Sequence, residues 1–211
     1  MFGKNGSIRI CDPAVYLKQS APGQQIKLLR SACIDEDKVP AYLIRDLNGC
    51  AVNAAACLVA FSAHGGSAPA GEDGRSFGPA LALCKKIAAD GFSKMRDGTR
   101  DYYTKIGREA PFVRRCLGAA SSGYSARSSL LVKRRAVSEI LAGRPVLLNI
   151  AFSGQYTDHT VTAYGFEEYA AGDNGRKVLF FKIRDGYTKE DRYLMFRGIL
   201  GISITYLKTK A

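Results

Sequence analysis

Residues 140–152 have the sequence ILAGRPVLLNIAF, and the hydrophobic pattern changes inside this stretch. The residues that lead into it, LLVKRRAVSEILAG (130–143), repeat apolar side chains at helical spacing, which predicts an amphipathic helix. The expected buried face of this helix consists of Val132, Ala136, Val137, Ile140 and Leu141. Gly143 and Pro145 are typical of a helix end. The apolar run VLLNIAF (146–152) then predicts a strand.

The same change of pattern separates the two halves of the chain. After residue 152, further strands are predicted over 159–166, 177–185, 192–196 and 202–208. Before residue 130, helices are predicted over 50–62, from an N-cap at Ser76 to Ala89, and over RDYYTKIGREA (100–110) with Thr99 as its cap. Loops are expected at 64–76 and 117–128. Helices followed by strands favour an α+β fold, in which a helical N-terminal part packs on a C-terminal antiparallel β-sheet.

The 211 residues carry a formal net charge of +12, and 46% of them are hydrophobic. This length fits one large domain or two small, closely packed ones. No apolar run approaches the roughly 18 residues that predict a membrane span. The N-terminal residues also lack the continuous apolar core of a signal peptide. We therefore expect a chain without a membrane span or a signal peptide. Such a chain would be cytoplasmic or exported by a signal-independent route.

The basic balance favours acidic partners, such as nucleic acid, anionic lipid or an acidic polymer. The cations are dispersed in short groups, and none forms a long tract interleaved with aromatic residues. Nucleic acid is therefore not an expected partner. The six cysteines and two histidines show no CxxC motif and no other metal-ligand spacing, so no metal site is expected.

His159 begins one of the predicted strands, HTVTAYGF (159–166). If the loop to the next strand is centred near residue 172, His159 faces Asp185 across the hairpin. Asp158 is adjacent in sequence but is expected on the opposite face of an extended strand. A carboxylate beside an imidazole fixes its tautomer and stabilises its charged form, so His159 and Asp185 are candidate catalytic residues. A solvated or structurally satisfied histidine is the alternative.

Cys50 lies at the start of a predicted helix in NGCAVNAAACLVAFSA (48–63). A helix N-terminus carries partial positive charge and free N–H groups, which stabilise a thiolate and can hold an oxyanion. A turn followed by a buried helix of small residues explains the same stretch without any chemistry. If His159 faces Cys50 from the other half of the chain, the pair suits thiol acyl transfer.

Taken together, three stretches resemble the papain-like cysteine peptidases, and within them the relatives of the bacteriocin-processing peptidases. VPAYLIRDLNGCAVNAAACLVAF (39–61) is similar to the family's opening, with Cys50 at the position of the nucleophile. ILAGRPVLLNIAFSGQYTDHTVTAYGF (140–166) is similar to the segment that carries the general base, with His159 at that position. FFKIRDGY (180–187) resembles the closing motif, in which Asp185 would orient the histidine.

This resemblance implies a papain-like fold, with the active site in the cleft between the helical part and the sheet. It implies a catalytic domain over 39–211 and an N-terminal extension of uncertain role over 1–38. It also implies a peptide or protein substrate, no cofactor, and hydrolysis of a peptide or isopeptide bond through an acyl-thioester on Cys50. Gln155 and Tyr156 are candidate substrate contacts.

One departure concerns the oxyanion hole. The family's glutamine stands six residues before the nucleophile, where this chain has Ile44. The backbone N–H of Cys50 and the side chain of Asn48 are then the candidates for that site. Two further interpretations stay open. One is an amidase, deamidase or acyltransferase that acts on a protein, as a delivered effector would; the other is a binding module on the same fold.

Overall fold

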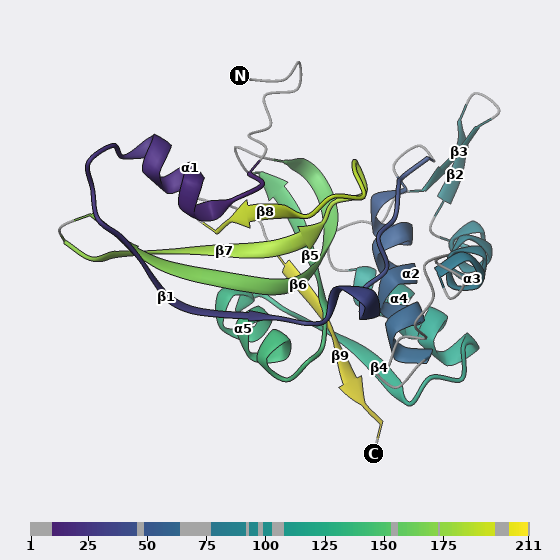
Figure 1. The fold of residues 1–211 in the computed structure, drawn as a ribbon. Coiled ribbons are helices and arrows are strands. Elements are labelled where there is room, and N and C mark those ends of the chain that lie inside the picture. Colours follow the sequence, from purple (N-terminus) through teal and green to yellow (C-terminus); the bar gives the residue numbers. More distant parts are fainter. Residues whose placement is uncertain are drawn as a thin grey trace.

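The computed structural model describes residues 10–45, 49–63, 77–91, 93–96, 99–102, 108–152, 156–172, 174–196 and 203–210. Over these residues the fold is α+β, with five α-helices and an antiparallel sheet of seven strands (Figure 1). The helices are α1 (Pro13–Ser20), α2 (Cys50–Ala63), α3 (Phe77–Ala89), α4 (Glu109–Ala119) and α5 (Val132–Leu141), with a short 3₁₀ helix η1 (Glu36–Lys38). The α+β class predicted from the sequence is confirmed.

The large sheet has the strand order β4-β9-β5-β6-β7-β8, and β1 pairs with β6 beside this path. Its strands are β1 (Ile26–Cys33), β4 (Tyr124–Ser129), β5 (Val146–Phe152), β6 (Thr157–Ala171), β7 (Arg176–Arg184), β8 (Arg192–Met195) and β9 (Ser203–Thr209). β5 pairs with the first half of β6 and β1 with its second half, while β7 lies along the other edge. The long strand β6 therefore joins two neighbours end to end.

A β-bulge in β6, between Ala163 and Gly165, changes which side chains face which side of the sheet. Before it, Val161 and Ala163 lie in the core beneath α5. After it, Phe166 lies in that core, although strict alternation from Ala163 would turn it away. Tyr169 instead packs with α1 residues on the other side. The extra residue of a bulge accounts for this switch.

Two cores lie on opposite faces of β5. Leu147 packs with the apolar residues of α2, α3 and α4, whereas Leu148 packs under α5. α2 is the central helix, with every residue from Ala51 to Ser62 buried. Figure 1 shows α2, α3 and α4 gathered at one side of the molecule, and α5 against the strands. α2 packs most closely with α3, and among the strands it contacts β6 most.

The N-terminal residues are part of the sheet. β1 pairs with β6 from Ile26 to Cys33, and Ile10 forms an isolated bridge with Tyr193 of β8. Ile10 and Leu17 are buried in a third core with Phe180. The stretch expected as an extension over 1–38 thus supplies α1, β1 and η1 to the described structure.

Several predictions of local structure were wrong. Thr99–Tyr102, expected to begin a helix, forms β3, which pairs with β2 (Ser93–Arg96). The stretch 117–128, expected as a loop, contains the end of α4 and most of β4, which pairs with β9 at the sheet edge. Leu141, expected on the buried face of α5, is 61% exposed and is the last residue of the helix. The predicted loop 64–76 lies outside the described residues.

Candidate active site

The three candidate catalytic residues lie at the ends of three elements. Cys50 is the first residue of α2 and is partly buried. His159 is near the start of β6, and Asp185 directly follows β7; both are buried. The carbonyl oxygen of Gly49 accepts from the backbone N–H of Asn53 at 3.0 Å and from its Nδ2 at 2.8 Å, which fixes the start of α2. Asp158, adjacent to His159, is exposed and has a left-handed φ of 48°.

The segment before Cys50 is tied to the segment after β7. The backbone N–H of Ile44 donates to the carbonyl of Gly186 at 2.9 Å. The hydroxyl of Tyr42, itself buried, donates to the carbonyl of Arg184 at 3.0 Å. Ile44, at the position where the resemblance to papain-like peptidases would lead one to expect a glutamine, thus contributes a backbone bond and apolar packing rather than a side-chain donor. These contacts hold the chain that leads into α2 against the residues that flank Asp185.

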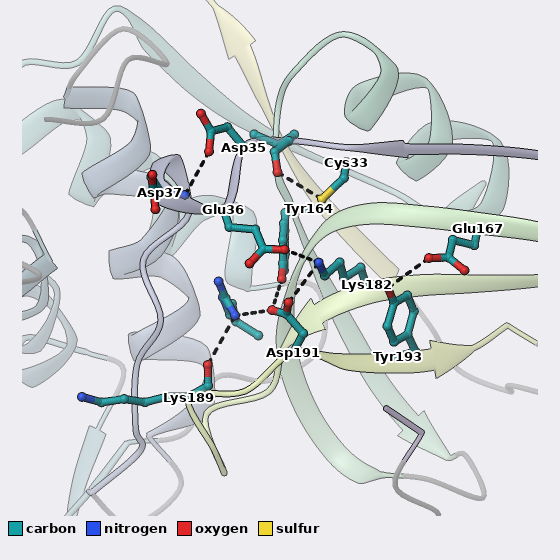
Figure 2. Close-up of polar contacts among 12 residues, drawn as sticks. Cys33, Asp35, Glu36, Asp37, Tyr164, Glu167, Lys182, Lys189, Asp191 and Tyr193 are labelled. Carbon is teal, nitrogen blue, oxygen red and sulfur yellow. Dashed lines mark hydrogen bonds and ion pairs between the residues drawn. The ribbon is translucent and has the colours of Figure 1, made fainter. Parts of the chain in front are cut away.

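A cluster of charged side chains fixes the C-terminal end of the segment that follows β7. Figure 2 shows Lys182 between the carboxylates of Glu36 and Asp191, with the Lys182–Asp191 pair at 2.9 Å. The hydroxyl of Tyr164 and the guanidinium of Arg184 also donate to Asp191. Residues 185–190, which carry the candidate Asp185, are therefore anchored at both of their ends.

The hydrogen bonds of His159 define its tautomer. Nε2 lies 2.7 Å from the main-chain carbonyl oxygen of Asp185, and a carbonyl oxygen can only accept. Nε2 therefore carries the proton of the neutral ring and donates it, which leaves the lone pair on Nδ1. Burial lowers the pKa of His159, and the hydrogen bond and charge of Asp185 oppose this only in part. The ring is thus held neutral, with Nδ1 able to accept a proton.

Asp185 contacts His159 through its main chain and other residues through its carboxylate. Oδ2 accepts from the Tyr156 hydroxyl at 2.9 Å, and Oδ1 accepts from the backbone N–H of Tyr187 at 2.9 Å. The prediction that Asp185 stands directly opposite His159 was wrong, because Thr162 pairs with Arg184 and the register is displaced by two residues. The hairpin closes later than assumed, with Ala171 paired to Arg176, which displaces the ladder by three residues, and the bulge then reverses one of the three.

Two tyrosines lie almost parallel to the imidazole of His159. The ring centroids of His159 and Tyr187 are 4.6 Å apart with an interplanar angle of 8°. Those of His159 and Tyr156 are 5.2 Å apart at 18°. Sequence reasoning proposed Tyr156 as a substrate contact, whereas the structure places it against His159 and Asp185. Sequence reasoning did not assign a role to Tyr187. The aromatic residue that follows Asp-Gly in FFKIRDGY could have indicated one.

Tyr187 lies against His159 and within electrostatic reach of Cys50 and Asp185. Its hydroxyl lies 3.5 Å from Nδ1 of His159. The pKa of Tyr187 is raised, first by burial and then by negative charge on Cys50 and on Asp185. Burial also raises the pKa of Tyr42, to which Cys57, Cys50 and Asp185 add their charges. Cys50 and Asp185 therefore lie within electrostatic reach of the same two tyrosines, one of which is stacked on His159.

Asn53 is a polar residue of this region that sequence reasoning missed. It is 1% exposed, and its Oδ1 has no hydrogen-bond partner in the described part of the chain. A single asparagine in the first turn of an otherwise apolar helix was the signal that could have found it. Asn48 and Gln155, two of the predicted site residues, lie outside the described residues.

The described residues hold no group of three or more His, Cys, Asp or Glu side chains placed to bind a metal ion. Among the helices with described positions, none combines the length and apolarity needed to cross a bilayer. No protein-family model matches the sequence, and no curated protein is significantly similar to it.

Proposed function

We propose that the chain is a papain-like cysteine hydrolase that cleaves a peptide or isopeptide bond in a protein or peptide. Cys50 is the nucleophile and His159 the general base. The observation that carries this proposal is the bonding of His159: Nε2 is committed to the Asp185 carbonyl, so the lone pair of Nδ1 is directed away from it. A buried, neutral histidine can accept a thiol proton, and Cys50, at a helix N-terminus, is its proposed donor.

The reaction proceeds in two halves. Nδ1 of His159 takes the proton of the Cys50 thiol, and the sulfur attacks the carbonyl carbon of the scissile bond. The C–N bond then breaks, and the leaving amine takes the proton from His159. In the second half water attacks the thioester and gives a proton to Nδ1, after which a carboxylic acid leaves and the thiol is restored. No cofactor takes part.

Asp185 acts in this proposal as a positioning residue. Its main-chain carbonyl fixes the tautomer of His159, while its carboxylate holds the Tyr187 backbone and the Tyr156 hydroxyl in place. Oxyanion stabilisation is assigned to the backbone N–H of Cys50, which is free of an intrahelical partner at the start of α2. The side chain of Asn48 is its proposed second donor.

The test is the rate of alkylation of Cys50 by iodoacetamide across pH, with exposed Cys11 as an internal reference in the same protein. At pH near 7, Cys50 is expected to react faster than Cys11, and His159→Ala to slow it at least about tenfold. Because burial lowers the pKa of His159, the difference is expected to extend to lower pH than an ordinary imidazole with a pKa of 6.5 would allow. Equal rates at Cys50 and Cys11, or no effect of His159→Ala, would contradict the proposal.

Asp185→Asn supplies a matched variant. It keeps the main-chain carbonyl that bonds His159 and changes only the carboxylate, so its effect is expected to be smaller than that of His159→Ala. Once an activated thiol is established, product analysis separates a hydrolase from its relatives. Backbone cleavage supports the proposal, whereas released ammonia or a transferred acyl group would assign the site to a deamidase or an acyltransferase.

A further inference from the structure

The most exposed large apolar side chains of the described structure belong to one short segment. Leu130 is 82% exposed and Leu131 is 71% exposed, directly before α5. They lie inside the sequence RSSLLVKRR (127–135), which runs from β4 into α5. We call the exposed leucines and cations of this segment the leucine–arginine patch. It consists of Arg127, Leu130, Leu131, Lys133, Arg134 and Arg135.

The fold does not require these two leucines to be apolar. The inward face of α5 already fills the core with Val132, Ala136, Val137 and Ile140. The exposed leucines contribute nothing to that core. Two neighbouring leucines that remain in water are a cost unless another surface covers them.

The charge around the leucines is directed outward. Lys133 pairs with Glu168 and Arg135 with Glu139, but the two acids are only 5% exposed while the cations are 47% and 45% exposed. Arg134 is exposed and has no ion pair within the described residues. The acids thus lie beneath the surface and the cations above it, so an approaching partner meets positive charge.

Strand β4 adds Arg127 to the same side. Arg127 pairs across the sheet with Tyr206 of β9, so the two side chains share a face. The guanidinium of Arg135 lies 4.8 Å from the ring centroid of the same Tyr206. Arg127 and Arg135 are therefore both neighbours of Tyr206, and the patch extends from β4 onto α5.

α5 itself presents a matching stripe. Leu131, Arg134, Ser138 and Leu141 follow one another at helical spacing, and all four are exposed. A helix of ten residues is about 15 Å long, so this stripe carries a leucine at each end and a cation between them. Leucines on either side of a cation suit a flat partner surface that offers both apolar groups and negative charge.

We propose that the leucine–arginine patch docks on the surface of an anionic lipid bilayer. Leu130 and Leu131 enter the boundary between headgroups and acyl chains, and the cations contact lipid phosphates. A second copy of the chain is a poor occupant, since each copy carries +12 charges. Nucleic acid would satisfy the cations but offers nothing to the leucines. The proposal does not depend on the chemistry of Cys50.

The test is co-flotation of the full chain with vesicles of phosphatidylcholine alone or with about 30% phosphatidylserine. The wild type is expected to bind only the anionic vesicles and to be released as salt rises from about 0.1 to about 0.5 M. The double variant Leu130→Ser/Leu131→Ser is expected to weaken binding at least tenfold, and Arg134→Glu several-fold. Circular dichroism and Cys50 alkylation check that each variant is folded.

Matched controls make the same changes elsewhere. Leu28→Ser alters a leucine that is 48% exposed on the α1 side of β1, and Lys18→Glu alters an exposed lysine of α1. Both are expected to bind like the wild type. Three results would overturn the proposal: no binding to anionic vesicles, unchanged binding by the leucine variant, or equal losses in the controls. If the chain bound double-stranded DNA as tightly as anionic vesicles, and the leucine variant did not weaken DNA binding, the patch would be assigned to polyanions in general.

Discussion

Two features favour glycine at position 186: its backbone conformation and the close approach of neighbouring side chains. Its φ is +77°, in the left-handed region, and an added Cβ would lie 2.5 Å from the Ile44 side chain and 2.8 Å from Tyr42. Gly175 has a similar φ of +62° but open space around it. We expect Gly175→Ala to cost about 1 kcal/mol of unfolding free energy, from the backbone alone. Gly186→Ala is expected to cost clearly more, since Ile44 and Tyr42 must also move.

Urea unfolding of the two alanine variants measures this difference. Because Ile44 and Tyr42 lead into α2, Gly186→Ala is also expected to slow alkylation of Cys50, whereas Gly175→Ala is not. Equal losses of stability in both variants would mean that Ile44 does not restrict this position.

His159 makes stability depend on pH. Burial lowers its pKa in the folded chain below the ordinary 6.5, so between the two values the unfolded chain binds more protons. Stability is therefore fully present above pH 6.5 and falls as pH decreases below it, by at most about 1.4 kcal/mol per pH unit. His159→Gln keeps an N–H donor without titrating. Urea unfolding between pH 7.5 and 5 should show a shallower slope for this variant, and identical slopes would refute the assignment.

For single residues, the sequence was sufficient to predict that Cys50 begins a helix. It was not sufficient to predict the contact between His159 and Asp185. A small-residue apolar run after Asn-Gly predicts a helix start, and α2 does begin at Cys50. The partner of His159 is a main-chain oxygen, and main-chain contacts depend on register. The register of the β6–β7 pair in turn depends on a bulge at Tyr164, which the local sequence pattern does not predict.

Among the elements, β1, β6 and α5 meet at one carboxylate. Glu168 of β6 accepts from Arg30 of β1 at 2.8 Å and from Lys133 of α5 at 3.0 Å. Burial raises the pKa of Glu168, but the two hydrogen bonds outweigh it, so the pKa lies below its usual 4.5. The stability gained from this group is present above pH 4.5 and is lost as pH falls below it.

Glu168→Gln is expected to lower the unfolding free energy by about 1–3 kcal/mol at pH 7, because two charge-assisted bonds are weakened at a buried site. Glu190→Gln is the matched control: Glu190 pairs with Arg192 at 3.3 Å but its side chain is 75% exposed. A change within about 0.5 kcal/mol is expected there. Chemical denaturation of both variants checks the contrast, and it fails if the two lose the same stability.

The elements that sequence reasoning found are those with strong apolar patterns. β5 was predicted with the bounds it has, and α2, α3, α5, β7, β8 and β9 lie within a few residues of prediction. β4 was missed because YSARSS has no apolar alternation; its pairing with β9 forms it. β3 was missed because a plausible helix cap at Thr99 competed with a hairpin, which the pairing to β2 decides.

For the whole molecule, the N-terminal residues complete the sheet. Leu17 of α1 is buried at 7% exposure, and Leu17→Ala is expected to cost about 2–4 kcal/mol. Val15 on the same helix is 47% exposed, and Val15→Ala should stay within about 0.5 kcal/mol. Removal of residues 1–38 deletes β1, one of the two strands that pair with the second half of β6, so the shortened chain should lose its cooperative thermal transition. A normal transition in that chain would mean that 39–211 folds alone.

The bulge in β6 also constrains how this chain can change during evolution. Ahead of it, odd-numbered residues such as Val161 face α5; behind it, even-numbered ones such as Phe166 do. Losing one residue between Ala163 and Phe166 would turn Phe166 and Glu168 over and separate Glu168 from Lys133. Deletions or insertions of two residues keep the faces. We therefore expect descendants of this sequence to vary β6 in length by even steps, or to gain and lose the bulge itself.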